Sequence, residues 1–406
     1  MNKLNFKTMR NKFLFAMTIA AALFTSCGED GTADIIINDN SVVNNNNGTG
    51  NSGTTGEAIS LSGNYTESLT LDIANTYTIT GPTIFEDGTT LTIPAGMTIK
   101  AAATGADVYL AIAQGAKINA EGTSSQPIIF TSAASTPNAG DWGGLIMLGK
   151  APVNSVSGNA TATSEIANLP YGGLLADDNS GMLRYVRVEY SGGKADGQSE
   201  NNGFSLYGVG NTTVLEYIQM FEGKDDGIEF FGGTVNVRYL SIVNAEDDSI
   251  DWTEGYTGNI TDAYVKHGVE HDKGIEADGY NSDIGNNSSP IFWSSPTVTN
   301  LTIIGLGSGT ANEAVRLREG TQGVFTNVWI EGFAEAFDLD GNTGNSPTGQ
   351  GVLDGTLKVN SVIFADVTKK LQNDTDFTFT DADFYTEDTT LMGTDYATWG
   401  AGWTRQ

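Results

Sequence analysis

Short segments of alternating apolar and polar residues recur along most of the chain. In one such segment the apolar residues occupy the first, fourth and sixth positions, and neighbouring copies in the middle of the chain are about 22 residues apart. The copies are Leu183–Val188, Leu215–Met220, Val237–Ile242, Ile260–Val265, Val298–Ile303, Phe325–Ile330 and Val359–Phe364. Since side chains alternate between the faces of a strand, each copy predicts a short strand with one buried face. Larger steps between other copies indicate insertions.

A second recurring unit is a triplet with one polar residue between two mostly apolar ones. The triplets are Phe204–Leu206, Ile228–Phe230, Ile250–Trp252, Ile275–Ala277, Val315–Leu317 and Phe337–Leu339. We expect the apolar members in a shared core and the polar members in one outward-facing row. A β-sandwich would not bury the same strand face once every 22 residues or so. A parallel solenoid must, because each coil buries its face only against the neighbouring coils. The pattern therefore predicts an all-β protein, a single right-handed parallel β-helix.

The ends of the predicted solenoid differ from its middle. Leu91–Ile99 and Ile112–Ile118 predict the N-terminal rungs, and we expect the aromatic tail around Trp399 and Trp403 to close the far end. Residues 58–406 are thus interpreted as one β-helix domain with capping coils at both ends.

The N-terminus has the features of an export signal. Basic residues up to Lys12 precede the apolar run Phe13–Phe24, which is too short to span a bilayer and predicts a signal peptide over residues 1–26. Small residues precede Cys27, the only cysteine, so we expect Cys27 to be the lipidated first residue of the mature chain. An ordinary signal peptide, which would leave a free thiol, is the alternative.

Residues 27–57 are interpreted as a flexible Asn-, Gly- and Thr-rich linker, because they offer little apolar surface to bury. Glu29 and Asp30 follow the cysteine directly and resemble the surface-export signal of Bacteroidetes lipoproteins. The expected location is therefore the outer membrane, through the Cys27 lipid, with the protein on the cell surface.

The chain resembles a group of Bacteroidetes cell-surface β-helix lipoproteins in the pectin-lyase-like superfamily, whose members are mostly uncharacterised. The resemblance covers most of residues 75–406. Its matching stretches are Gly96–Ile99, Gln114–Gly122, Gly140–Asn154, Leu183–Tyr190 and Phe231–Asn236, of which Gly140–Asn154 is the most specific. The resemblance implies the fold, but it implies no single activity because one fold hosts many functions.

The charge balance is strongly acidic, with 20 basic and 49 acidic residues and a formal net charge of −29. Such a surface repels nucleic acid, so we expect no nucleic-acid partner, and it attracts cations. With a single cysteine the chain cannot form an intramolecular disulfide, and its stability must come from packing.

Acidic residues gather at corresponding positions of three predicted coils. The candidate cation ligands are Asp225, Asp226, Glu246, Asp247, Asp248, Asp251, Asp272 and Glu276. If the triplets stack in register, Glu229, Asp251 and Glu276 lie about 4.8 Å apart per coil. Carboxylates at that spacing need raised pKa values, a bound cation or a neighbouring base such as Arg316. Calcium is the candidate cofactor, because it prefers oxygen ligands. Solvated turn residues are the alternative.

The same carboxylates could also act as catalytic residues. Pairs on adjacent coils would stand near the ~5 Å of a retaining glycosidase, and pairs two coils apart near the ~9 Å of an inverting one. The catalytic candidates are Glu229, Asp251, Glu276 and Arg316. A lyase would need Arg316 or Arg318 as its base beside a calcium ion. Paired aspartates resemble those of polygalacturonases, but the accompanying Gly-His-Gly and Arg-Ile-Lys elements are missing.

Aromatic residues near the acidic row could stack on sugar rings, or they could belong to the core. The stacking candidates are Trp252, Tyr256, Tyr280 and Trp293. Two histidines and one cysteine are too few for a zinc pattern or a Ser/His/Asp triad to be supported.

The preferred function is therefore non-catalytic: a surface lipoprotein that presents an acidic β-helix face to a glycan or protein partner. One alternative is a calcium-dependent polysaccharide lyase or glycoside hydrolase on acidic glycans. The other is a structural subunit of an outer-membrane assembly.

Overall fold

The computed structural model describes residues 36–37 and 56–406, except for residues 158–159, 195–200, 282–290, 311 and 342–347. The predicted signal peptide and Cys27 lie outside the described residues, and so does the predicted linker apart from residues 36–37 and 56–57. Among the helices that the structure describes, none combines the length and the apolar character needed to cross a membrane.

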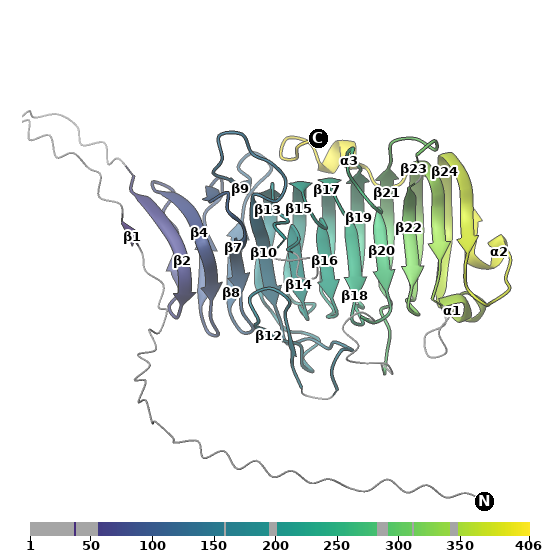
Figure 1. Ribbon diagram of the computed structural model, residues 1–406, viewed down its shortest axis with the longest axis horizontal. Helices are drawn as coiled ribbons and strands as arrows, with labels where there is room; N and C mark the ends of the chain where they lie inside the picture. The colour runs from purple at the N-terminus through teal and green to yellow at the C-terminus, as the bar shows by residue number, and fades with distance from the viewer. Residues whose placement is uncertain are drawn as a thin grey trace, which may run out of the picture. The chain divides into compact units, whose positions relative to one another are not determined.

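Three columns of short parallel strands build the domain (Figure 1). Each coil passes through the first column, bends at a corner into the second, and reaches the third through a turn. Leu215 pairs with Val237, and Ile218 with Leu240, at the positions that the repeat predicted. The predicted parallel β-helix is therefore confirmed.

The first column begins with β3 (Leu69–Thr70), β5 (Thr90–Ile93) and β8 (Lys117–Glu121), and the second with β2 (Ala58–Tyr65), β4 (Thr76–Phe85), β6 (Thr98–Ala101) and β9 (Ile128–Ser132). Longer strands then bend through both columns: β13 (Gly181–Glu189), β15 (Val214–Gly223), β17 (Asn236–Ala245), β19 (Asn259–Lys266), β21 (Thr297–Ile304), β23 (Gly323–Leu339) and β24 (Leu357–Asn373). The third column begins with the C-terminal ends of β2 and β4. It continues through β7 (Gly105–Ile112), β10 (Trp142–Leu148), β14 (Phe204–Tyr207), β16 (Ile228–Phe231), β18 (Ile250–Thr253), β20 (Ile275–Asp278), β22 (Glu313–Arg318) and the ends of β23 and β24.

The corner between the first two columns repeats a strained backbone conformation. Tyr185, Tyr217 and Tyr239 occupy it on successive coils with φ angles of 51°, 53° and 60°, in the left-handed region that bulky residues rarely adopt. Their rings stack with centroids 4.3 Å and 4.1 Å apart, which offsets that strain. On later coils the corner is continued by an amide ladder, in which Asn327 donates to Asn300.

The two ends of the solenoid are covered by short elements. At the N-terminal end, β1 (Ile36–Ile37) pairs antiparallel with β2. At the C-terminal end, α1 (Thr348–Asp354), α2 (Asp381–Phe384) and β25 (Tyr385–Glu387) contact β24. The ring of Phe384 packs edge-on against Phe337 at 5.3 Å and thereby closes the core.

The expectation that the aromatic tail closes the far end was wrong. Residues 393–406, which contain α3 (Tyr396–Trp399) and which we call the strap, run back along the flank of the coils (Figure 1). Trp403 packs edge-on against Tyr185 and Tyr217, with centroids 5.6 Å and 6.2 Å away. The reason is apolar burial: α2 and β25 already cover the last coil, whereas the tyrosine corner leaves rings exposed on the flank.

A long insertion follows β10 and covers part of the third column. Residues 149–180 contain the hairpin of β11 (Ala162–Thr163) and β12 (Pro170–Tyr171). Its apolar side chains form a second buried cluster with the outward-facing side chains of four strands: Tyr109 and Ala111, Ile146 and Leu148, Tyr207, and Phe231. The outer face of the third column is thus largely apolar on these strands, and a series of charged residues begins on it with Glu229 of β16.

Candidate functional site

The polar members of the third-column triplets form one row, as the repeat predicted. Glu229 pairs in register with Asp251, and Asp251 with Glu276. Arg316 follows on the next coil and Asp338 on the one after it. We call these five residues the charged row. They lie half-buried or buried on the outer face, while their apolar strand neighbours fill the core.

A second row, the turn row, lies in the turns that lead into these strands. It consists of Asp225 and Asp226, Asp247 and Asp248, and Asp272 on three successive coils. The backbone N–H of Asp248 donates to Asp226 Oδ1 at 2.9 Å, and the N–H of Lys273 donates to Asp248 Oδ1 at 2.7 Å. Each aspartate therefore caps the turn of the following coil.

Glycine lets these turns approach one another closely. A Cβ on Gly227, which follows Asp226, would lie 2.5 Å from the carbonyl oxygen of Ser249 on the next coil. On Gly274 it would lie 2.7 Å from the carbonyl oxygen of Ala314. The side chain before each glycine is consequently brought against the neighbouring coil.

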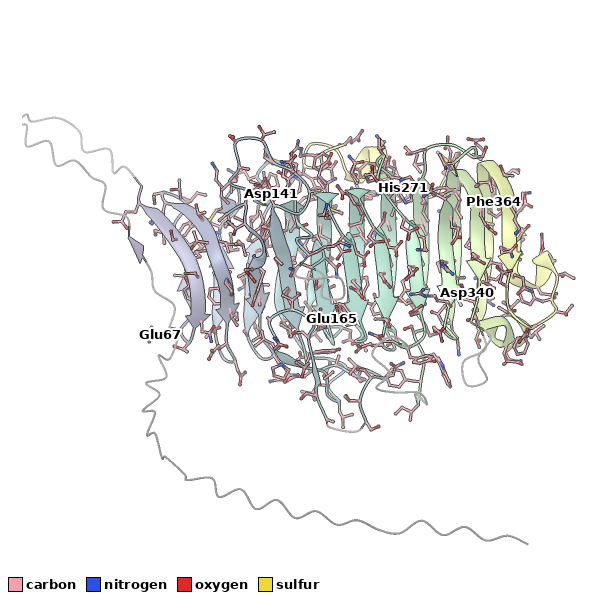
Figure 2. All side chains as sticks on the ribbon, viewed as in Figure 1. Glu67, Asp141, Glu165, His271, Asp340 and Phe364 are labelled. Carbon is pink, nitrogen blue, oxygen red and sulfur yellow. The ribbon has the colours of Figure 1, made fainter. Side chains whose placement is uncertain are left out.

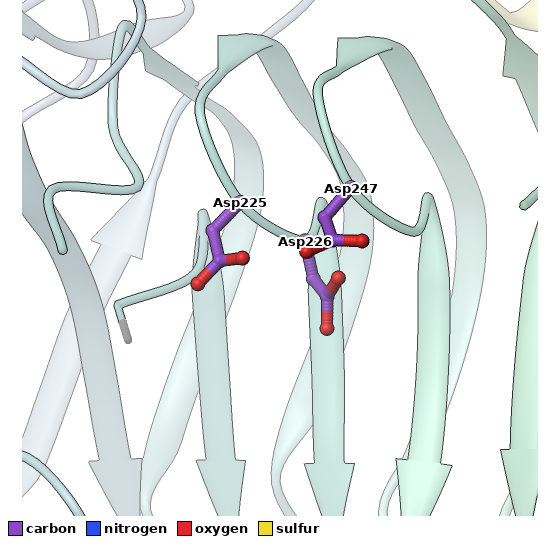
Figure 3. A group of neighbouring side chains, drawn as sticks. All are labelled: Asp225, Asp226 and Asp247. Carbon is purple, nitrogen blue, oxygen red and sulfur yellow. The ribbon is translucent and has the colours of Figure 1, made fainter. Parts of the chain in front are cut away.

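Carboxylates of the two rows come close enough to share a cation. In each of four groups, one oxygen per residue lies within 4.8 Å of the others. The groups are Asp225, Asp226 and Asp247; Asp226, Glu229 and Asp251; Asp247, Asp248 and Asp272; and Asp248, Asp251 and Glu276. Figure 3 shows the first group, in which side chains from two neighbouring turns converge. Because Ca²⁺ prefers several oxygen ligands, these residues fit a calcium site.

The electrostatics of the rows also favour a cation. The pKa values of Asp226, Glu229, Asp248 and Asp251 are all raised, first by burial and then by neighbouring negative charges. Oδ1 of Asp251 is buried and accepts no hydrogen bond from the described residues. Without a cation these carboxyl groups retain protons above their ordinary range, and a bound divalent cation would replace those protons.

Lys273 stands where the preceding coils carry Asp226 and Asp248, and it is 6 % exposed. Its Nζ atom lies 2.7 Å from Asp272 Oδ2 and 3.0 Å from Glu276 Oε1. Burial lowers the pKa of Lys273, but the surrounding carboxylates outweigh burial and the pKa is raised. The ammonium therefore neutralises the C-terminal end of the acidic groups.

Both arginines proposed as lyase bases are held in ion pairs. Arg316 Nη2 lies 2.6 Å from Asp340 Oδ2, and Arg318 lies 2.5 Å from Glu276 and 2.6 Å from Asp278. Burial lowers the pKa of Arg318, but Asp278 and Glu276 raise it by more. Acidic partners likewise outweigh burial and raise the pKa of Arg316. These contacts stabilise the protonated form, so neither side chain is placed as a general base here.

Three candidates from the sequence lie outside the groups described so far: Glu246, Tyr280 and Trp293. Glu246 is half-buried, lies 3.5 Å from Lys224, and is absent from the carboxylate groups formed by the described residues. Tyr280 and Trp293 are half-buried.

Two of the proposed stacking residues are core residues, which corrects that expectation. Trp252 and Tyr256 have no exposed surface. Trp252 Nε1 donates to Thr321 Oγ1 at 3.0 Å, and the Tyr256 ring stacks on Phe230 with centroids 4.2 Å apart. Trp252 occupies the inward position of its triplet, so its burial follows from the same alternation that directs Asp251 outward.

The insertion brings further polar groups to the N-terminal end of the charged row. Glu254, 1 % exposed, accepts hydrogen bonds from Ser155 and Tyr171 of the insertion, both at 2.7 Å. The negative charge of Glu165, labelled in Figure 2, contributes to the raised pKa of Glu229. The insertion is thus fixed beside the first carboxylate of the row.

Three polar residues at the site were missed by sequence reasoning. Asn202 donates to Glu229 Oε2 at 2.7 Å, and Lys194 Nζ lies 3.4 Å from Asp225 Oδ1. Lys273 is the third. Asn202 and Lys273 share the turn position of Asp226, so aligning the turns as well as the strands would have identified both. No repeat signal marks Lys194.

Comparison with known proteins agrees with this architecture. The family model described as a pectate-lyase-like β-helix domain matches residues 63–404. A search of the curated proteins and a search of the solved structures each found no match. Since the family match spans nearly all of the described solenoid, the chain belongs to the pectate-lyase-like β-helix family.

Proposed function

We propose that the protein is a non-catalytic surface lipoprotein that binds Ca²⁺ on its two acidic rows and, through the cation, an acidic glycan. The single observation that carries the proposal is the set of four overlapping carboxylate groups on neighbouring coils. Ca²⁺ takes about 6–8 oxygen ligands, so three carboxylates leave positions open for oxygens of a partner.

A cation also resolves an electrostatic conflict. A chain with a net charge of −29 repels a polyanionic sugar. Bound Ca²⁺ converts part of that surface into a binding site for carboxylates, because the ion is the largest local charge. Bound Ca²⁺ can coordinate the carboxylates of a uronic-acid polymer, whereas an uncharged glycan carries no carboxylates for it to bind. Uronic-acid polymers are therefore the ligand class that the site favours.

Catalysis by the charged row is the second candidate. Glu229 and Asp251 lie side by side on adjacent coils, as the acid and the nucleophile of a retaining glycosidase do. Burial raises the pKa of Glu229, which suits the acid, whereas the nucleophile must be ionised. The β-elimination of a lyase is less well supported, since Arg316 and Arg318 are engaged with carboxylates.

The cellular location is part of the proposal. Lipidation of Cys27 would attach the chain to the outer membrane, and residues 28–57 would hold the β-helix away from it. Replacing Cys27 with Ser should move the protein from the membrane fraction to the soluble fraction. Retention in the membrane fraction would contradict the lipid anchor.

The test is binding of polygalacturonate to the full-length chain by calorimetry, with Ca²⁺ and with chelator. We expect binding only with Ca²⁺, and binding at least about tenfold weaker in Glu229→Gln. Glu67→Gln is the matched control, because it removes the same charge from an exposed site. Calcium-independent binding, or no binding, would refute the proposal. Release of reducing or unsaturated products would replace it with the enzymatic candidate.

A further inference from the structure

The chain's two histidines form a separate cluster on the turn between β19 and β20. His267 follows β19 directly and is 3 % exposed, and His271 is half-buried. Their ring centroids lie 4.2 Å apart with the planes at 48°. The ring of Phe333 stands edge-on to His267 at 5.1 Å and forms the apolar side of the cluster.

Both imidazoles lack the hydrogen bonds that buried polar groups normally make. Among the described residues, none hydrogen-bonds to Nδ1 or Nε2 of either ring, although all these atoms are buried. The backbone of Lys273 approaches His267 closely enough to influence its pKa, without reaching hydrogen-bond geometry. A buried polar atom without a partner is unfavourable, so two adjacent rings in this state call for a ligand.

The histidine pair is chemically suited to a metal. The four ring nitrogens of His267 and His271 are buried together in one cluster. Neutral imidazole is a preferred ligand of Zn²⁺, Cu²⁺ and Ni²⁺, whereas Ca²⁺ prefers carboxylates. The cluster therefore differs in metal preference from the acidic rows, although Asp272 is the next residue along the chain.

We propose that His267 and His271 bind a transition-metal ion of the Zn²⁺, Cu²⁺ or Ni²⁺ class, each through one ring nitrogen. An ion held by the pair would lie about 2.0–2.1 Å from one nitrogen of each ring. His271 lies at the edge of the domain in Figure 2, and the adjacent Glu270 is exposed. The two rings supply two ligands, and water would complete the coordination of the ion.

The test is a Cu²⁺ titration of the full-length chain without a histidine tag, in excess Ca²⁺ so that the acidic rows do not compete. Electron paramagnetic resonance distinguishes the two kinds of site, because imidazole nitrogens split the copper signal and carboxylate oxygens do not. We expect one Cu²⁺ per chain with nitrogen splitting, and retention of the copper against an equal concentration of Zn²⁺. A copper signal without nitrogen splitting would overturn the proposal.

Variants locate the ligands. His267→Gln and His271→Gln should each weaken Cu²⁺ binding at least about tenfold and simplify the nitrogen splitting. Glu270→Gln, an exposed change on the same turn, should leave both unchanged. If His267→Gln fails to fold, the His271→Gln variant, at a half-buried position, is sufficient for the test. Wild-type affinity and splitting in His271→Gln would overturn the assignment.

Discussion

At the scale of single residues, the outer face is organised by which side chain each coil places at one repeated position. Asp226 and Asp248 add negative charge at the turn position, and Lys273 ends the series by pairing with Asp272 and Glu276. Two coils later, Asp338 renews the acidity on the charged row. The acidic site is therefore bounded by the positive charge of Lys273. Removal of a charge at Asp226 or Asp248 and removal of the charge at Lys273 should have opposite effects on cation binding.

Asp338 provides a test through pH. Burial, and then Glu313, raise the pKa of Asp338 from 3.8 to about 7. The folded chain thus binds a proton that the unfolded chain releases, and stability must fall as pH rises from about 4 to about 7. In chelator, Asp338→Asn should reduce that loss and raise stability at pH 8 by at least about 1 kcal/mol, measured by urea unfolding.

The matched control for this prediction is Asp107→Asn, which changes an exposed aspartate and should leave the pH dependence unaltered. A wild-type stability that increases from pH 5 to pH 8 in chelator would contradict the assignment. So would an identical pH dependence in wild type and Asp338→Asn.

At the scale of elements, the strap connects coils that are distant in sequence. Gln219 donates to the carbonyl oxygen of Arg405 and accepts from its backbone N–H, both at 2.8 Å. At the other end, the N–H of Thr394 donates to Thr302 Oγ1 at 3.0 Å. Because coils of a solenoid otherwise contact only their neighbours, the strap adds contacts that oppose separation of the coils.

The strap should make a measurable contribution to stability. Trp403 is 1 % exposed, and Trp403→Ala should lower stability by about 3 kcal/mol or more, seen as a lower urea midpoint. Met392→Ala, just before the strap and at a side chain that is 81 % exposed, should have little effect. Equal midpoints for Trp403→Ala and wild type would show that the strap is dispensable for folding.

At the scale of the whole molecule, the features that repeat along the chain could be predicted from the sequence. Side chains alternate between the two faces of a strand, and this alternation places Glu229, Asp251 and Glu276 on one face. The strap and the insertion could not be predicted, since neither repeats and both depend on apolar flanks that exist only after the coils stack. The pairing of His267 with His271 depends likewise on the path of a single turn.

The central claim is that the two acidic rows bind Ca²⁺, and calorimetric titration of the full-length chain with Ca²⁺ tests it most directly. We predict saturable binding to the wild type and at least about tenfold weaker binding to Asp251→Asn, whose carboxylate belongs to two of the groups. Asp177→Asn, an exposed change of the same charge, should bind as the wild type does. Absence of binding, or equal affinity in Asp251→Asn and the wild type, would contradict the account.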